Sequence, residues 1–81
     1  MNYPMYSIRD IKTCFLAPNC DQSDQSAIRN FAYAINDKGV MNYSPKDFDL
    51  YKVGEYDSET GVITGCLPEL ICQGINVIGE K

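Results

Sequence analysis

The pattern of apolar and polar positions divides the start of the chain into two short strands. Residues 5–10 alternate between two sets of side chains, with the period of two that is typical of a strand. A polar break at residues 10–13 follows, and the apolar run at residues 14–17 predicts a return strand. Proline cannot donate a backbone hydrogen bond within a sheet. We therefore expect Pro18 and Asn19 to end that strand.

A stripe of apolar residues at helical spacing predicts a main helix in the middle of the chain. The stripe consists of Ala27, Ile28, Phe31, Ala34 and Ile35. Ser23 is the expected N-cap, with Asp21 as the alternative. Asp24 then lies in the first turn, where a carboxylate meets the positive end of the helix dipole. Gly39, which follows Lys38, is the expected C′ residue of the helix.

The second half of the chain predicts a hairpin. Residues 48–56 read as a strand with apolar side chains on both faces. Residues 57–61 have the length and composition of a hairpin loop, in which Gly61 is free to adopt a positive φ. We expect Asp57 to accept hydrogen bonds from its own turn backbone. Residues 62–64 are the expected return strand.

Further breaks in the pattern complete the expected fold. Gly65 and Pro68 are expected to end the return strand. A fifth short strand is expected at residues 70–72 or at residues 75–78, and residues 79–81 are expected to fray. The order β-β-α-β-β, with this added strand, predicts the α+β class, in which a small, mostly antiparallel sheet carries one helix on one face.

A lone helix covers only part of one face of such a sheet. We expect Tyr6, Tyr51, Val53 and Tyr56 to crowd the uncovered side. An exposed apolar patch of that kind usually marks a partner surface. We therefore expect a homodimer or another protein partner at this face.

Length, charge and composition narrow the function classes. The chain is expected to form a single domain, residues 1–81. Seven Lys and Arg against eleven Asp and Glu give a net charge of −4, which argues against coating nucleic acid by charge alone but leaves room for a local basic patch. Histidine is absent, which excludes Ser-His and Cys-His catalytic pairs, and no glycine-rich phosphate motif occurs. We therefore expect no enzymatic activity and no cofactor.

The sequence also bears on location. No apolar run is long enough to span a bilayer, and the first residues have neither the basic leader nor the apolar run of a signal peptide. We expect the protein to stay in the cytoplasm of the cell that makes it, without a membrane partner.

The cysteines form two pairs, each with five intervening residues. They are Cys14, Cys20, Cys66 and Cys72. Zinc ligands are typically separated by about two to four residues, so this spacing matches a zinc site poorly. We expect small, buried apolar side chains in a reducing cytoplasm. A structural zinc site and disulfides are the alternatives.

Acidic side chains concentrate around the predicted hairpin. They are Asp47, Asp49, Glu55, Asp57 and Glu59. The segment lacks the glycine and glutamate positions of a calcium-binding loop. We interpret these residues as solvated strand edges and turn formers.

Six tyrosines and three phenylalanines, with cations among them, point to another chemistry. Tyrosine-rich sheet surfaces stack the bases of single-stranded nucleic acid, because every base has a π-face. The candidate DNA-binding residues are Arg9, Lys12, Arg29, Lys46, Tyr51, Lys52 and Tyr56. The alternatives for the aromatic residues are core packing and a protein–protein surface.

Three segments within residues 3–65 resemble a known family in their order and spacing. They are "YSIRDIKTCFLAPN", "AIRNFAYAIN" and "SPKDFDLYKVGEYDSETG". They resemble the small non-structural protein of gokushovirus-type microviruses, which are single-stranded DNA phages. The resemblance implies a DNA-binding protein tied to phage genome replication and packaging in a bacterial host. It maps Arg29 and residues 46–52 onto matching family positions.

The chain departs from the family pattern at two loop sites. Ser44 stands where the family has a histidine before proline, and Asn19 and Cys20 stand where it has proline and phenylalanine. These departures bear on a loop-borne site more than on the fold. Residues from Cys66 onward carry little of the resemblance.

Together, the pattern and the resemblance lead to one main hypothesis and one alternative. The hypothesis is a phage accessory protein that binds single-stranded DNA modestly through an aromatic, basic sheet face. Dimerisation would place two such faces side by side and raise the local positive potential. The alternative is an interaction module that docks on a phage or host replication protein, or on a capsid protein, without touching DNA.

Overall fold

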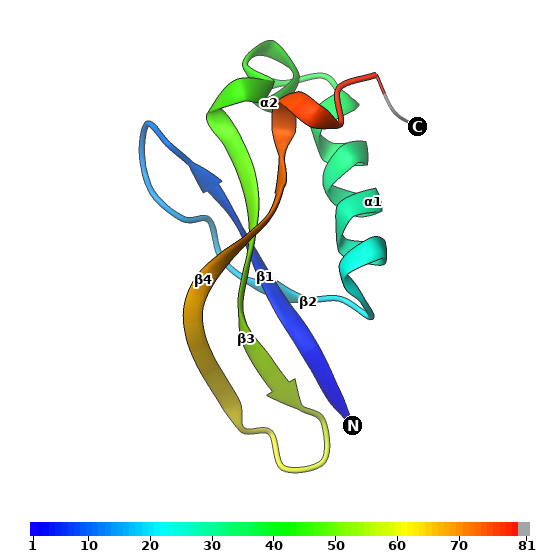
Figure 1. The fold of residues 1–81 in the computed structure, drawn as a ribbon, viewed down its shortest axis with the longest axis vertical. Helices are drawn as coiled ribbons and strands as arrows, with labels where there is room; N and C mark the ends of the chain where they lie inside the picture. Colours follow the sequence, from blue (N-terminus) through cyan, green and yellow to red (C-terminus); the bar gives the residue numbers. More distant parts are fainter. Residues whose placement is uncertain (80–81) are drawn as a thin grey trace.

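The structure, a computed structural model, describes residues 1–79 and shows an antiparallel sheet with a helix packed on one face (Figure 1). The strands lie in the order β2-β1-β3-β4 across the sheet. The elements are β1 (Asn2–Asp10), β2 (Asn19–Cys20), α1 (Asp24–Asn36), α2 (Val40–Tyr43), the 3₁₀ turn η1 (Pro45–Asp47), β3 (Phe48–Asp57), β4 (Ile63–Gln73) and the 3₁₀ turn η2 (Gly74–Asn76). The predicted α+β class is confirmed.

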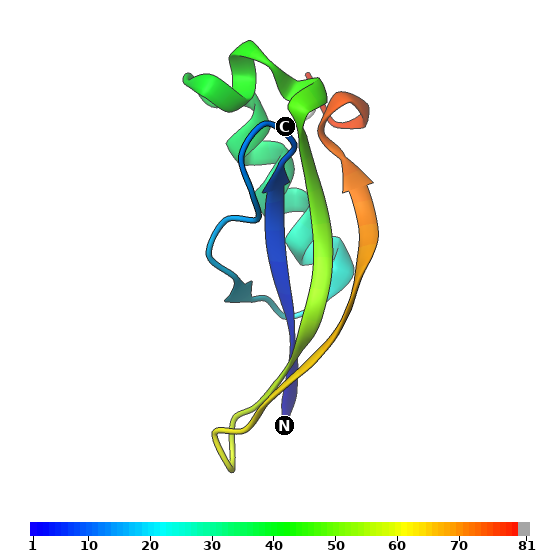
Figure 2. The same cartoon turned by 90° about the vertical axis from the view of Figure 1, so that its left-hand side faces the viewer.

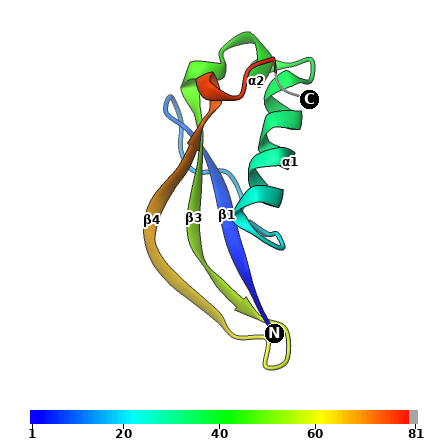
Figure 3. The ribbon, with the colours of Figure 1, turned by 45° about the vertical axis from the view of Figure 1, so that its right-hand side comes forward.

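The strand pairing decides which side chains meet the helix. Directly paired residues of neighbouring strands share a face of the sheet, and successive rows alternate between faces. The rows on the side of α1 include Asp10–Phe48, Ile8–Leu50–Cys72 and Tyr6–Lys52–Glu69. The core cluster consists of Tyr6, Ala27, Phe31, Ala32, Ile35, Phe48, Leu50 and Val77. Figure 3 shows α1 against the upper part of the strands, while the hairpin end of β3 and β4 projects beyond the helix.

The helix α1 begins where the sequence predicts and ends earlier. The Ser23 hydroxyl oxygen accepts a hydrogen bond from the Ser26 backbone N–H at 3.2 Å, which confirms the N-cap. The helix ends at Asn36, and the Asp37 N–H closes its last turn. The expectation that Gly39 is the C′ residue is therefore wrong; Gly39 precedes α2, with φ 145°. Within residues 1–79, no helix is long and apolar enough to cross a membrane.

Residues 14–17 do not form the expected return strand. An isolated bridge and a hydrogen bond from the Leu16 N–H to the Ile8 carbonyl oxygen, at 2.8 Å, hold this segment against β1. Proline has no N–H to donate, so regular pairing with β1 begins only after Pro18, at Asn19. The expectation that Pro18 and Asn19 end the strand is therefore wrong, since Asn19 begins β2.

The strand β4 continues through the residues that were expected to end it. Gly65 and Pro68 both lie inside β4, which is an outer strand of the sheet. Proline is tolerated on an edge strand, because its missing N–H is not needed there. Residues 66–68 form a bulge between the paired residues Gly65 and Glu69, opposite the single β3 residue Val53. A bulge therefore replaces the expected break.

The expected fifth strand does not occur among the residues that the structure describes. Residues 70–72 belong to β4, and residues 75–78 fall in η2 and the turn that follows it. The chain was expected to fray at residues 79–81, of which residues 80–81 lie outside the described residues. Gly79 is held, because its N–H donates to the side-chain oxygen of Asn36 at 2.5 Å.

The hairpin loop matches its sequence-based prediction. The Asp57 carboxylate accepts hydrogen bonds from the backbone N–H groups of Glu59 at 2.9 Å and Thr60 at 3.4 Å. These bonds hold the pKa of Asp57 below its ordinary value, and the bond from the Glu59 N–H has the largest effect. Gly61 adopts φ 77°, in the left-handed region that favours glycine.

Candidate functional site

The face of the sheet that points away from α1 carries aromatic and aliphatic side chains, and we call it the open face. Its rows are Arg9–Asp49–Gln73, Ser7–Tyr51–Leu70, Met5–Gly54–Gly65 and Tyr3–Tyr56–Ile63. The three tyrosines of these rows are half-buried, whereas Leu70 and Ile63 are exposed. The open face therefore offers both rings and alkyl groups to another molecule.

An extra residue in β3 brings Tyr56 onto the same face as Tyr51. In a regular strand, residues five positions apart lie on opposite faces, because side chains alternate. The pairing with both neighbouring strands passes over Val53, which shifts the alternation by one position. Tyr51 and Tyr56 therefore lie together on the uncovered side, as the sequence predicts, and Val53 lies in the irregularity between them.

Phe15 joins the open face from the segment between β1 and β2, which arches away from the sheet edge in Figure 2. Its ring meets the ring of Tyr51 edge to face, with centroids 5.4 Å apart and planes at 73°. The guanidinium carbon of Arg9 lies 5.7 Å from the centre of the Phe15 ring, within the range of a cation–π contact. Arg9, Phe15 and Tyr51 thus form a continuous cluster, and Phe15 is not among the residues that the sequence predicts for this face.

Tyr6 does not lie on the uncovered side, so that expectation is wrong. It is 2 % exposed and belongs to the core cluster beneath α1. Its register sets it in the row beside the one that contains Tyr51, on the opposite face. The Tyr6 hydroxyl donates a hydrogen bond to the Asp24 carboxylate at the start of α1. Burial first, and then this carboxylate, raise the pKa of Tyr6.

Several cations gather at the end of the sheet where β1 finishes and β3 begins. Arg9 lies on the open face, Lys12 lies in the turn after β1, and Lys46 lies in η1. The Ile11 N–H donates to the Asp47 carbonyl oxygen at 3.0 Å, which joins that turn to η1. This end of the sheet is adjacent to the cluster of Arg9, Phe15 and Tyr51.

The other predicted cations lie elsewhere. Lys52 is paired with Tyr6 and Glu69, so it is on the helix side of the sheet rather than beside Tyr51. Arg29 is exposed on α1, which packs against that same side. The structure therefore groups Arg9, Lys12 and Lys46 but separates Lys52 and Arg29 from the open face.

The hairpin end of the sheet is acidic, although its strand carboxylates lie by register on the side opposite Tyr56. Glu55 and Asp57 lie at the end of β3, and Glu59 follows in the loop. The N-terminal amine lies 4.0 Å from Asp57 Oδ1. Asp10, Asp47 and Asp49 lie at the same end of the sheet as the three cations, so the charges of the β1 end balance, whereas the hairpin end has an excess of carboxylates that disfavours a polyanion.

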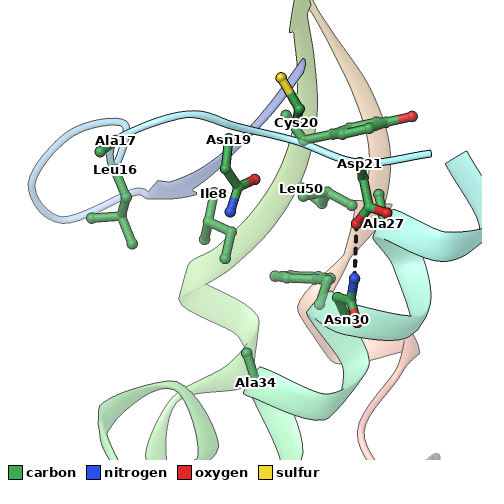
Figure 4. A pocket seen from close by; sticks show the side chains of 12 residues that line it. Ile8, Leu16, Ala17, Asn19, Cys20, Asp21, Ala27, Asn30, Ala34 and Leu50 are labelled. Carbon is green, nitrogen blue, oxygen red and sulfur yellow. Dashed lines mark hydrogen bonds between the residues drawn. The ribbon is translucent and has the colours of Figure 1, made fainter. Parts of the chain in front are cut away.

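A groove lies between α1 and the segment 16–21, with a cavity volume of about 320 Å³ (Figure 4). The apolar part of its lining includes Ile8, Leu16, Phe31, Ala34 and Leu50, and its polar part includes Asn19, Asp21 and Asn30. The Asn30 amide donates to the Asp21 carboxylate at 2.8 Å, the bond drawn in Figure 4. Interaction with the Ser26 hydroxyl, and then with Asn30, lowers the pKa of Asp21, so this carboxyl is ionised at neutral pH. The groove therefore suits neutral or cationic groups.

The cysteines are not the buried side chains that were expected. Cys14, Cys20 and Cys66 are exposed, and Cys72 is half-buried. The exposed ones lie in a loop, on a two-residue edge strand and in the bulge of β4, where the backbone itself is at the surface. Within residues 1–79, no group of three or more Cys, Asp or Glu side chains is arranged to hold a metal ion.

Comparison with known proteins gives a match to one family model. No curated protein and no solved structure matches the chain. Residues 3–77, which include every strand and helix described above except the first residue of β1, match the model of the family described as Phage ORF5 protein. The chain therefore belongs to the Phage ORF5 protein family, a family of bacteriophage proteins.

Proposed function

We propose that this phage protein is a non-structural accessory protein of the gokushovirus type that serves genome replication or packaging. In this role it binds single-stranded DNA weakly through the open face. The observation that carries the proposal is the cluster of Arg9, Phe15 and Tyr51, in which a cation lies over a ring that meets a second ring. Bases stack on such rings without sequence preference, and arginine adds cation–π contacts.

The charge distribution supports one end of the open face as the contact region. Arg9, Lys12 and Lys46 supply positive charge near the aromatic cluster. Asp49, the direct partner of Arg9 across the strands, offsets that charge together with Asp10 and Asp47. The net charge of −4 opposes a polyanion at longer range. Binding is therefore weak, strongest at low salt, and confined to the β1 end.

The proposal revises the residue set that the sequence suggests. Tyr51 remains as a stacking residue, with Phe15 added, and Arg9, Lys12 and Lys46 remain as phosphate contacts. Tyr56 is left out, because it lies at the hairpin end of the open face. Lys52 and Arg29 are left out, because they lie on the helix side.

An NMR titration with a short single-stranded oligonucleotide at low salt tests the location. The expected result is that backbone amide signals of residues 9–15 and 49–51 shift on titration, while those of residues 57–61 do not. Shifts confined to the hairpin end, or to α1, would contradict the proposed surface. The same spectra report whether the fold is unchanged.

The groove favours a second function, that of an adaptor for a phage or host replication protein or for a capsid protein. An apolar floor beside the ionised Asp21 suits a partner that presents an apolar side chain next to a lysine or arginine. Purified replication and capsid proteins of the phage, titrated one by one, test this function. Binding that is lost in Asp21→Lys but kept in Asp37→Lys, an exposed control at the end of α1, supports the adaptor. Binding of DNA with no binding to any of these proteins argues against it.

A further inference from the structure

The strand β4 presents a long free edge. It spans Ile63–Gln73, pairs with β3 on one side and forms the outer limit of the sheet, as Figures 1 and 2 both show. The first eight residues of its burial pattern are all exposed. Its large apolar side chains are open to solvent: Leu67 is 90 % exposed, Ile63 63 % and Leu70 47 %. Soluble monomers usually protect such an edge with charged side chains.

The charge of this region is unusual for the chain. Glu69 is the one acidic or basic residue in the sequence from residue 62 to residue 79, although the whole chain carries eighteen such residues, seven basic and eleven acidic. DNA or a basic protein would find a single charge to contact along β4. A second copy of this acidic chain, by contrast, approaches β4 without meeting a row of like charges. The neutral, apolar edge therefore fits another neutral, apolar edge.

We propose that β4 pairs antiparallel with β4 of a second copy, and that this edge-to-edge contact forms a dimer. Antiparallel pairing of identical strands is isologous. If one residue of the first copy contacts a second residue of the other copy, the reverse contact also forms, because a twofold axis relates the copies. Main-chain hydrogen bonds across the free edges supply the contact, as in β-augmentation. With the axis perpendicular to the sheet, the open faces of both copies lie on the same side. The joined sheet then doubles the cations and rings on one surface.

The bulge of β4 shapes this contact. Residues 66–68 stand outside the ladder with β3, and Pro68 has no N–H to offer. The ladder also passes over Ile71, between Leu70 and Cys72. Edge-to-edge hydrogen bonds therefore come from the paired residues within 63–65 and 69–73, and the exposed Leu67 fills the space between these segments. The opposite edge of the sheet is the two-residue strand β2, which is too short to continue pairing. The assembly therefore closes at two copies.

Sedimentation equilibrium over a range of protein concentrations tests the proposal on the full chain. The wild type is expected to dimerise reversibly. Leu67→Asp and Leu70→Lys are each expected to weaken dimerisation by at least about tenfold, as charged substitutions at the centre of an interface do. Tyr43→Asp is the matched control, because Tyr43 is 88 % exposed on α2 and its substitution leaves β4 unchanged. Circular dichroism confirms that each variant is folded.

Amide hydrogen exchange provides the second readout. Amides of residues 63–65 and 69–73 are expected to exchange more slowly at high protein concentration than at low concentration. A wild type that stays monomeric across the range overturns the proposal. So does a dimer that both variants leave intact, or one whose added protection lies only outside β4. DNA binding by Leu67→Asp, which lies outside the rows of the open face, is measured separately, so that a failure of self-association and a failure of the proposed function are distinguishable.

Discussion

The ring of Phe15 meets the ring of Tyr51 edge to face, with centroids 5.4 Å apart and planes at 73°. This contact fastens the segment between β1 and β2 onto β3, a strand that the segment does not pair with. It also holds Phe15 beneath the guanidinium of Arg9. The chemistry of the open face thus depends on a contact between residues that are 36 positions apart, counting from 15 to 51.

Removal of the Phe15 ring tests this contact. Phe15→Ala is expected to lower the free energy of unfolding by about 0.5–1.5 kcal/mol through the loss of the aromatic pair. The loss of the buried area of the ring adds to this effect. Urea unfolding measures the loss. Phe15→Tyr keeps the ring and is expected to retain most of the stability. An alanine variant as stable as the wild type would mean that the ring pair does not anchor the segment.

The glycine pair between β3 and β4 allows a sharp comparison. A Cβ on Gly54 would lie 2.4 Å from the Thr64 carbonyl oxygen, whereas the nearest atom to a Cβ on Gly65 is the Val53 carbonyl oxygen at 3.9 Å. Gly54→Ala is therefore expected to cost more than about 1 kcal/mol, and Gly65→Ala, its direct cross-strand partner, less than about 0.5 kcal/mol. Thermal unfolding measures both, with a shift of about 4–8 °C per kcal/mol for a domain of this size. Equal losses of stability in the two variants would mean that the close backbone approach between β3 and β4 does not lie at Gly54.

The buried tyrosine predicts a response to alkaline pH. The pKa of Tyr6 is raised above the ordinary 10.0, so the folded state keeps its proton when the unfolded state has lost it. The stabilising contribution is therefore complete below about pH 10 and shrinks as the pH rises further.

In Tyr6→Phe this alkaline decline in unfolding free energy is expected to be smaller, and stability at neutral pH is expected to fall by about 1 kcal/mol with the lost hydrogen bond. Urea unfolding at neutral and alkaline pH measures both effects. Tyr33→Phe serves as the control, because Tyr33 is 78 % exposed. If Tyr6→Phe follows the same pH curve as the wild type, the tyrosine does not couple folding to ionisation.

Local signals in the sequence are sufficient to predict the start of α1 and the hairpin loop. The Ser23 cap, the apolar stripe and the Asp57 turn each act through neighbours within a few residues. Strand faces depend on partners that are distant in the sequence. The alternation along β1 is visible in the sequence, but only the pairing of Ser7 with Tyr51 shows that Tyr6 faces the helix.

The dependence on distant strand partners also explains why the length of β4 and the membership of the candidate site do not follow from the sequence. Pro68 reads as a strand break unless the strand is known to be at an edge, where proline is tolerated. Tyr51 and Tyr56 share a face only because the pairing passes over Val53, and a bulge of that kind has no clear signal in the chain. Phe15 read as part of a return strand rather than as a ring that packs on Tyr51.

Salt dependence tests which cations contact phosphate. Each cation that neutralises a phosphate of single-stranded DNA contributes about 0.7 to the slope of log affinity against log salt concentration. Arg9→Gln and Lys12→Gln are each expected to reduce the slope by about that amount. Arg29→Gln, on the exposed side of α1, is expected to leave it unchanged. A reduced slope in Arg29→Gln with none in Arg9→Gln would move the contact region to the helix.

Fluorescence anisotropy with a labelled single-stranded oligonucleotide at low salt tests the central claim most directly. We expect saturable binding by the wild type, weakened about tenfold in Tyr51→Ala by the loss of one stacked base, and unchanged in Tyr33→Ala on the helix. No binding at low salt, where phosphate contacts are strongest, would contradict the claim, as would wild-type affinity in a folded Tyr51→Ala.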